Sequence, residues 1–498
     1  MANHIHSPRI LIIGAGPTGL TLACELARRN ISFRIIDRSL VYPVGSRAKG
    51  LQPRSLEVFN DIGIAEKVLA SGRSEIIFRK FNGNQAMGDI RREVFPREDT
   101  RFFKGSMIPQ WRIEEILREE LARYDMAVEL DTELVNISQD QASVVATLRR
   151  GERVEEASFD YLVGCDGGKS TVRKTVGIRF EGETHEDEKA LVGDVEIEGL
   201  VPDAWHMWSH PKYGFGMALC PFAGTKSWQL QAIAIPDADG NIPEPTLETF
   251  NKLFQEVANM PGVVFTNATW RSVYRVNIRM ADKYRVGRVF IAGDAAHVHS
   301  IAGGLGMNTG IQDAYNLGWK LAAVLEGTAD AALLDTYEEE RLPVAAWTLN
   351  ISSERHKAVL ESASKGKVSL ENTGTKDTTQ LNLNYRYSSL SVGTKDDAAL
   401  LQPGDRAPDA LLPDGSWLSD LYRGAHFTVL AFGLKEPPKL LVDNQHSDRV
   451  KVWAMTDKNS AAAFGGRQGF FVIRPDGYIG LIADRDEVPA VNDYLSRF

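Results

Sequence analysis

The residues of this chain that could bind a nucleotide gather in three glycine-bearing segments that lie far apart in the sequence. They are residues 14–19 (Gly-Ala-Gly-Pro-Thr-Gly), 165–168 (Cys-Asp-Gly-Gly) and 293–297 (Gly-Asp-Ala-Ala-His), the last followed by a glycine-rich run over 303–310. Glycine lets backbone N–H groups approach a phosphate closely, and aspartate accepts hydrogen bonds from sugar hydroxyls. The combination indicates one nucleotide held from several sides.

The first segment lies between a predicted strand and a predicted helix. Residues 9–13 form a short apolar, β-branched run, typical of a strand buried on both faces, and helical periodicity follows from Thr18. A second predicted strand, 33–36, ends in Asp37, about 20 residues beyond the loop, where a dinucleotide-binding fold places its ribose acceptor. A glycine-rich turn without a ligand is the alternative, but strand, helix and acid together favour a dinucleotide site.

Composition limits the class of protein. A chain of 498 residues predicts about three domains, and a formal net charge of -9 argues against nucleic acid and anionic membrane as partners. Three cysteines without a CxxC pair predict neither a disulfide framework nor a metal site. No apolar run approaches membrane-spanning length, so we expect a cytoplasmic enzyme.

The pattern of apolar and polar residues along the chain predicts an α/β protein with an α+β insert. Residues 1–178 read as the first part of a Rossmann-like nucleotide-binding domain, and the alternating runs of 179–279 predict an inserted antiparallel sheet. Residues 280–360 return to the nucleotide-binding domain and include a long helix from about Gly310 to Leu325. Residues 361–399, where apolar patterning lapses, predict a linker, and 400–498 predict a separate α/β module with a hairpin around Asp476.

The start of the long helix carries its own signal. Residues 309–312 (Thr-Gly-Ile-Gln) fit a capping box, so we expect the helix to begin at Thr309 with free N–H groups and a positive dipole end. The alternative is a glycine-rich helix cap that binds no ligand.

These motifs and their order resemble the single-component, class A flavin-dependent aromatic hydroxylases, the group of para-hydroxybenzoate and phenol hydroxylases. The sequence is most similar to the branch that modifies polyketides and polycyclic phenols. Similarity covers most of the chain, and residues 403–409 and 474–477 match the thioredoxin-like C-terminal domain of that branch. Because this domain lacks CxxC here, the resemblance implies a packing or dimerisation role for it.

The resemblance implies FAD as the cofactor and assigns residues to it. Glycines of the first loop would bind the pyrophosphate, Asp37 the ribose, Arg47 a phosphate, Gln110 the flavin chain and Asp294 the ribityl chain. Asp166 and Arg173 would serve both FAD and NAD(P)H, and backbone N–H groups near Met307 would face the flavin ring. The full set is Gly14, Gly16, Pro17, Thr18, Gly19, Asp37, Arg38, Arg47, Gln110, Asp166, Arg173, Gly293, Asp294, Gly306, Met307 and Asn308. Surface charges at Arg47 and Arg173, and a helix cap at Gln110, are the alternatives.

The family reaction follows from the same resemblance. NADPH or NADH, for which the chain has no second Rossmann loop, would reduce the flavin transiently. Molecular oxygen would then give a flavin C4a-hydroperoxide that hydroxylates a phenolic, quinonoid or polycyclic aromatic substrate. The enzyme would be a monomer or a homodimer. Epoxidation, Baeyer–Villiger oxidation and antibiotic inactivation remain open, as does a non-catalytic flavoprotein or ligand carrier. The chain departs from the family at Ile301, usually proline, and at Leu305, usually glutamine.

An aromatic-rich stretch in the insert is the candidate substrate pocket. It contains Trp205, His206, Trp208, His210, Tyr213, Phe215 and Phe222. These residues offer enough apolar surface for a fused-ring ligand, and either histidine could help to ionise a phenol. The alternatives are that the aromatic residues are ordinary strand core and that the histidines lie in exposed turns.

Overall fold

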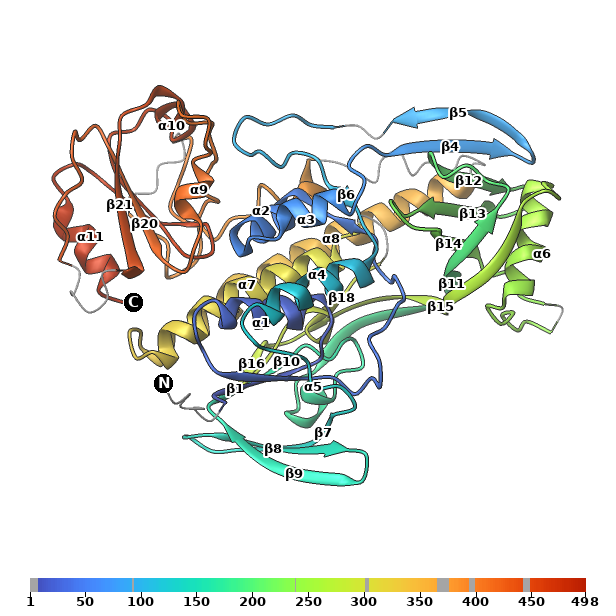
Figure 1. Cartoon of the computed structure of the whole chain (residues 1–498), viewed down its shortest axis with the longest axis horizontal. Coiled ribbons are helices and arrows are strands. Elements are labelled where there is room, and N and C mark those ends of the chain that lie inside the picture. The colour runs from blue at the N-terminus through green and yellow to red at the C-terminus, as the bar shows by residue number, and fades with distance from the viewer. Residues whose placement is uncertain are drawn as a thin grey trace.

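The protein is elongated, with the C-terminal module at one end, the insert sheet at the other and two long helices between them (Figure 1). The computed structural model describes residues 8–91, 94–237, 239–300, 304–364, 376–393, 399–441 and 448–498. Within them, the predicted α/β architecture with an antiparallel insert is confirmed.

The nucleotide-binding sheet has five strands in the order β16-β17-β10-β1-β2. Its strands are β1 (Ile10–Ile13), β2 (Phe33–Ile36), β10 (Tyr161–Gly164), β16 (Arg285–Val286) and β17 (Val289–Ile291). All pairs are parallel except β16–β17. Every residue of β1 is buried, as its unbroken apolar run predicts.

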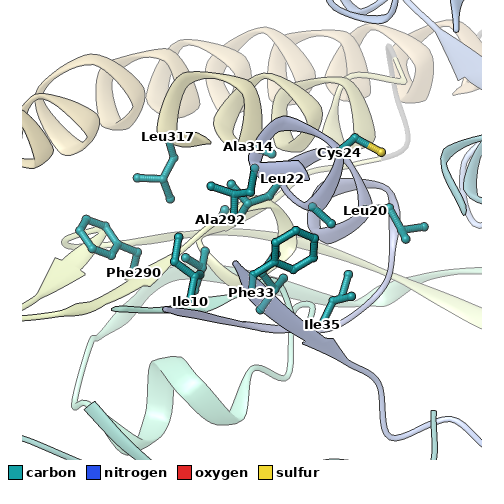
Figure 2. Packing of buried hydrophobic residues seen from close by; sticks show 14 of the residues in the cluster. Ile10, Leu20, Leu22, Cys24, Phe33, Ile35, Phe290, Ala292, Ala314 and Leu317 are labelled. Atoms are coloured by element: carbon teal, nitrogen blue, oxygen red, sulfur yellow. The ribbon is translucent and has the colours of Figure 1, made fainter. Parts of the chain in front are cut away.

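Helices α1 (Pro17–Ala27) and α7 (Gly306–Leu325) pack against this sheet and against each other. Figure 2 shows Leu22 of α1 and Leu317 of α7 on the side of the sheet that carries Ile10 and Phe290. Gly318 permits the close contact, since a Cβ atom there would lie 2.7 Å from Cβ of Glu25. The loop before each helix is thereby brought to the same edge of the sheet.

The remaining elements of the first region surround this core. The helices are α2 (Pro53–Ile62), α3 (Ala65–Ala70), α4 (Gln110–Ala122) and α5 (Thr171–Thr175). Two small antiparallel sheets consist of β3 (Gly50–Leu51) with β6 (Ser106–Met107), and of β7 (Glu133–Gln139), β8 (Val144–Arg150) and β9 (Arg153–Phe159).

The insert forms an eight-stranded sheet in the order β18-β15-β11-β14-β13-β12-β4-β5. Its strands from the predicted insert are β11 (Phe180–Glu198), β12 (Trp205–His210), β13 (Gly214–Pro221), β14 (Ser227–Ile233) and β15 (Val264–Ala281). Strands β4 (Ile77–Asn82), β5 (Gln85–Arg91) and β18 (His297–Val298) come from outside the insert. Helix α6 (Leu247–Ala258) covers one face, where its Phe250 and Phe254 join a buried apolar cluster with Trp208 and Leu230.

The predicted start of the long helix is wrong by three residues. Helix α7 begins at Gly306, and its first backbone hydrogen bond runs from Thr309 N to Leu305 O, at 2.8 Å. The Thr309 hydroxyl is buried inside the helix and donates to the same Leu305 carbonyl at 3.0 Å. Because this hydroxyl bonds backwards to a carbonyl, it caps no N–H group, and the Thr-to-Gln spacing is not a capping box here.

The C-terminal module is a second five-stranded sheet, β19-β23-β22-β20-β21. Its strands are β19 (Val392–Gly393), β20 (Phe427–Phe432), β21 (Val450–Met455), β22 (Gly469–Ile473) and β23 (Ile479–Ala483), with helices α9 (Ser419–Tyr422), α10 (Lys458–Ala463) and α11 (Val488–Leu495). The predicted hairpin is the β22–β23 pair. A thioredoxin-like fold for this module stays a prediction.

The structure differs from the predicted linker over 361–399. Helix α8 (Asp335–Ser364) extends into this segment, and residues 376–393 fold against the core with Leu381, Tyr385 and Leu390 buried. A charged cluster fixes the module here, because Arg474 donates to Glu340 at 2.5 Å and Lys320 donates to the same carboxylate at 2.7 Å. The remaining linker residues lie outside the described ranges.

Candidate cofactor and substrate site

The first glycine loop leaves open space at the start of α1. Gly14 (φ +100°) and Gly19 are needed for packing, since a Cβ atom would lie 2.4 Å from the Cys165 carbonyl oxygen and 2.0 Å from the Gly14 carbonyl oxygen respectively. At Gly16, by contrast, no described atom lies within 4 Å of such a Cβ. Pro17 then occupies the first position of the helix, so unpaired N–H groups of the first turn face this space. A helix N-terminus of this kind binds a phosphate.

Asp37 follows β2, as predicted, and its carboxylate holds two backbone segments. Oδ2 accepts a hydrogen bond from Ala15 N and Oδ1 accepts one from Ser39 N, both at 2.9 Å. The carboxylate therefore fixes the glycine loop and retains lone pairs for a sugar hydroxyl. Arg38 beside it is exposed.

The loop that carries Arg47 is braced from both sides. Gln110 Oε1 accepts from Ala48 N at 3.2 Å, while Gln229 Nε2 of the insert sheet donates to the Ser46 carbonyl at 2.5 Å. Gly45 lies flat against the Trp270 ring, where a Cβ atom would meet ring carbons at 2.4 Å. The structure thus gives Gln110 a positioning role, and its direct flavin contact stays a prediction.

Several charged side chains lie near the Arg47 loop. Burial raises the pKa of Glu114 to about 7, with Gln110, Arg118 and Arg47 acting to lower it. Burial likewise raises the pKa of Asp294 against the effects of His297 and Arg47. The Asp294 residue is nevertheless exposed to solvent, so its carboxylate is accessible to a ligand. The predicted residues Arg47 and Asp294, 247 positions apart in the chain, therefore lie within electrostatic reach of each other.

Asp294 lies on a tight turn that is held from below. Gly293 (φ +61°) and Gly310 both pack against Thr18, with 2.4 Å between the Thr18 hydroxyl and a Cβ atom built on either glycine. Beneath the turn, Asp313 accepts hydrogen bonds from Gly293 N at 3.1 Å, His297 Nε2 at 2.7 Å and Arg341 Nε at 2.7 Å. Burial acts to raise the pKa of Asp313, but Arg341 and His297 lower it to about 2. Sequence reasoning missed Asp313 and Arg341, because both lie on helices with other polar residues, and nothing local marks them as buried partners.

The first turn of α7 also faces this region. The N–H groups of Gly306, Met307 and Asn308 precede the first helical hydrogen bond, so they are available at the positive end of the helix. The Asn308 side chain joins the helix to the start of α2, since Oδ1 accepts from Gln52 N at 2.8 Å and Nδ2 donates to Gly50 O at 3.0 Å. Leu305 is fully buried as the helix cap, and Ile301 lies outside the described residues.

The second glycine segment is tied to the third by Arg173. Its guanidinium is buried and donates to Ala295 O and Gly168 O, both at 2.9 Å. Asp166 Oδ2 accepts from the first N–H groups of α5, Thr171 N at 2.6 Å and Val172 N at 3.1 Å. Its other oxygen is buried with no partner among the described residues, which suits a ligand hydroxyl. Arg173 is thus not a surface charge, and the hydrogen bonds of its guanidinium go to backbone carbonyls. Its role in NAD(P)H binding stays a prediction.

These groups fit FAD. The α1 N-terminus and Arg47 match the pyrophosphate, while Asp37, Asp166 and Asp294 offer carboxylate oxygens for sugar and ribityl hydroxyls. The α7 N-terminus offers N–H groups for the acceptors of a flavin ring. Among the described residues, no cluster of histidine, cysteine and carboxylate side chains could hold a metal ion. No helix in the described ranges combines the length and apolar character of a membrane span.

The predicted aromatic pocket is largely core. Trp208 is buried and lies 5.1 Å from the Phe254 ring of α6, with its Nε1 donating to Gly83 O at 3.1 Å. His206 is buried on the same face, stacked 5.4 Å from Phe81, so its predicted exposed turn is wrong. The reason is the strand alternation, which turns residues 206 and 208 together toward α6.

The other aromatic candidates are dispersed. Tyr213 is exposed at the β12–β13 turn, its ring 4.8 Å from that of His210. Phe222 is buried, and Phe215 packs against a small apolar cluster that contains Phe78, Met207 and Cys220. No single pocket among the described residues therefore gathers the predicted set.

The face of the insert sheet that meets the Arg47 loop instead carries polar residues beside a small apolar cluster. Gln229 and Gln231 alternate with the buried Trp228 and Leu230, and Asp194 is the register partner of Gln229. The alternation Trp-Gln-Leu-Gln over residues 228–231 predicts that the two glutamines share one face of the strand. Nearby, a cleft of about 120 Å³ opens beside Gln52 and is lined by Ile76, Val94, Phe95, Phe103 and Lys104. An aromatic ligand with polar substituents suits such surroundings.

Comparison with known proteins agrees with this geometry. Residues 8–352 match a family model described as FAD binding domain. The chain is 40% identical over 497 residues to a flavin-dependent monooxygenase of Mycobacteroides abscessus, with 98% of this chain and 99% of that protein covered. It is 34% identical over 516 residues to 6-methylpretetramide 4-monooxygenase of Streptomyces rimosus, covering 96% of this chain and 91% of that one.

A solved structure shares the whole fold. Aklavinone-11 hydroxylase, crystallised with FAD and aklavinone, has a TM-score of 0.82 at 24% identity, covering 100% of this chain and 99% of that one. Its likeness concerns the fold alone, whereas the family match and the two relatives cover most of the sequence. The chain therefore belongs to the FAD-dependent aromatic monooxygenases.

Proposed function

We propose that the protein uses FAD, NADPH or NADH, and molecular oxygen to hydroxylate a phenolic or polycyclic aromatic compound. The observation that carries the proposal is that the N-termini of α1 and α7, Arg47 and Asp294 lie in one region of the molecule, beside the face of the insert sheet that carries Gln229. The two relatives named above act, by their names, as monooxygenases, one of them on 6-methylpretetramide.

The chain's own residues would hold and orient the reactants. When bound, FAD supplies a ring that accepts hydride and activates oxygen. Gly16 and Arg47 would hold its pyrophosphate, Asp37 and Asp294 its hydroxyls, and the α7 N-terminus would stabilise negative charge on the ring. The insert sheet and the Arg47 loop would close over the substrate and keep water away from it.

The proposal includes a monomer or homodimer in the cytoplasm, where NADPH and NADH are supplied. Sedimentation of the FAD-loaded protein tests its subunit number.

The reaction is tested with FAD-loaded protein and a panel of phenols, naphthols and anthraquinones. We expect NADPH or NADH oxidation to rise with a substrate, and the product to gain one oxygen atom by mass spectrometry. Stimulated oxidation that yields only hydrogen peroxide across the panel would refute hydroxylation. An epoxide or a ring-expanded lactone would assign a different outcome to the same cofactor.

A further inference from the structure

We propose that the Lys49 ammonium binds the ionised hydroxyl of the aromatic substrate, so that the enzyme selects acidic phenols over their ethers. This inference rests on the proposed function and adds the substrate's charge state to it. Three observations carry it: the position of Lys49, the contacts of its side chain, and the charges around it.

Lys49 lies between the region proposed for the flavin ring and the region proposed for the aromatic substrate. It is two residues after Arg47 in the braced loop and next to Gly50, whose carbonyl accepts from Asn308 in the first turn of α7. Its side chain reaches the opposite wall, where Nζ donates to Gln229 Oε1 and lies 4.2 Å from the Trp205 ring centroid. The ammonium therefore stands between the helix end that suits the flavin ring and the polar face of the insert sheet.

The lysine has hydrogen-bonding capacity to spare. An ammonium carries three N–H donors, and among the described residues only Gln229 accepts one of them. The residue is half-buried, so part of its surface remains open to a ligand. Trp205 under the ammonium provides a cation–π contact and a flat apolar wall, which suits a ring that carries a charged oxygen.

No described carboxylate forms an ion pair with the Lys49 ammonium, although Asp194 is a nearby negative charge at neutral pH. Asp194 of β11 is fully buried and more than ion-pair distance from Lys49, and neither of its oxygens makes a well-formed hydrogen bond within the described part of the chain. The Ser46 N–H and hydroxyl are nevertheless close enough to lower the Asp194 pKa, which burial raises to about 6. Cys220 of β13 faces the same lysine, and burial raises the pKa of its thiol to about 11, so it stays neutral.

Burial lowers the pKa of Lys49 to about 8, with Cys220 and Asp194 acting to raise it. Lys49 is therefore charged at neutral pH, yet it is desolvated, and a desolvated cation attracts an anion more strongly than a hydrated one does. On binding, the phenol O–H bond breaks, the proton passes to water, and the phenolate oxygen pairs with the ammonium. The ring becomes more electron-rich, as attack on it by an electrophilic oxygen requires.

The test measures the ionisation of a bound dye. Alizarin, a dihydroxyanthraquinone whose colour changes on ionisation, is titrated into FAD-loaded protein between pH 5 and 7.5, where Lys49 stays protonated. Asp194, with a pKa of about 6, changes charge in this range, so the titration is repeated in Asp194→Asn, which should ionise the bound dye at least as readily. An adjacent opposite charge lowers an acid's pKa by about 1 to 3. We expect the bound dye to ionise at least one pH unit below the free dye, and alizarin to bind at least about tenfold more tightly than its dimethyl ether.

Three variants separate the outcomes. Lys49→Met should abolish both effects, Lys49→Arg should retain them, and Lys226→Met, at an exposed turn of the same sheet, should behave as wild type. The flavin absorbance of each variant reports its fold. If Lys49→Met binds FAD and still acidifies the dye, the inference is overturned while the proposed function stands. If the wild type binds neither alizarin nor any member of the phenol panel, the proposed function fails and this inference fails with it.

Discussion

Replacing Gln229 by leucine should weaken FAD binding, although Gln229 lies on the insert sheet and not in the nucleotide-binding domain. Its Nε2 donates to the buried Ser46 carbonyl at 2.5 Å, and its Oε1 accepts from Lys49 and, at 3.1 Å, from Gln231. Leucine roughly keeps the volume, so the change removes hydrogen bonds more than packing. The loop that presents Arg47 then loses its anchor on the sheet.

The magnitude follows from the Ser46 carbonyl. A buried acceptor left without its partner costs about 1–3 kcal/mol. In the FAD-free variant the loop can relieve that cost by turning toward water, and FAD binding has to restore the closed position. The dissociation constant of FAD should therefore rise by about 5- to 150-fold, at 1.4 kcal/mol for each factor of ten.

The assay is a titration of cofactor-free protein with FAD, followed by calorimetry or by flavin fluorescence. Gln231→Leu is the matched control, because its side chain donates only to Gln229 within the described structure and should change the constant by less than about threefold. If Gln229→Leu folds and binds FAD as tightly as the wild type, the insert sheet does not position the Arg47 loop, and this reasoning is wrong.

Three further predictions concern the turn under Asp294 and the glycine loop. Asp313→Asn should lower the free energy of unfolding by about 3–5 kcal/mol in urea, because Arg341 is left buried beside a neutral group, and Asp313→Asn/Arg341→Met should recover part of the loss. The pKa of Asp313 is lowered from 3.8 to about 2, so its ionisation contributes about 2 kcal/mol to the free energy of unfolding above about pH 4, and this is lost as pH falls toward 2. Acid unfolding, followed by tryptophan fluorescence, should therefore be less steep in Asp313→Asn. Identical unfolding curves would contradict the assignment. Gly19→Ala would place a Cβ atom 2.0 Å from the Gly14 carbonyl oxygen, so the loop must move and FAD retention after gel filtration should be lost; full retention would show that the loop does not bind the cofactor.

Local patterns in the sequence predicted the framework well, because each depends on neighbouring residues. The strand, loop and helix around Gly14, the acid at Asp37 and the hairpin at Asp476 are all confirmed as structural features. The convergence of the glycine segments was also predictable, since parallel strands end at the same edge of a sheet.

The errors arose where a distant contact decided the outcome. The Thr309 hydroxyl bonds to Leu305 inside the helix, so the capping pattern misplaced the start of α7. The direction of Trp208 depends on which face α6 covers, and residues 376–393 fold because isolated anchors such as Tyr385 find buried sites. Lys49 and Asp194 come near each other only in the folded chain, and neither carries a signal in its own segment.

The most direct test of the FAD site is a substitution that keeps the fold and fills the space at the start of α1. Gly16 caps that helix with φ −75°, a conformation that aspartate adopts readily, and no described atom lies within 4 Å of the added Cβ. Gly16→Asp should therefore unfold at the same urea concentration as the cofactor-free wild type, or a higher one. The wild type should bind one FAD per chain, whereas the variant, with a carboxylate where the pyrophosphate belongs, should bind none. A folded Gly16→Asp protein that binds FAD with wild-type affinity would contradict the account.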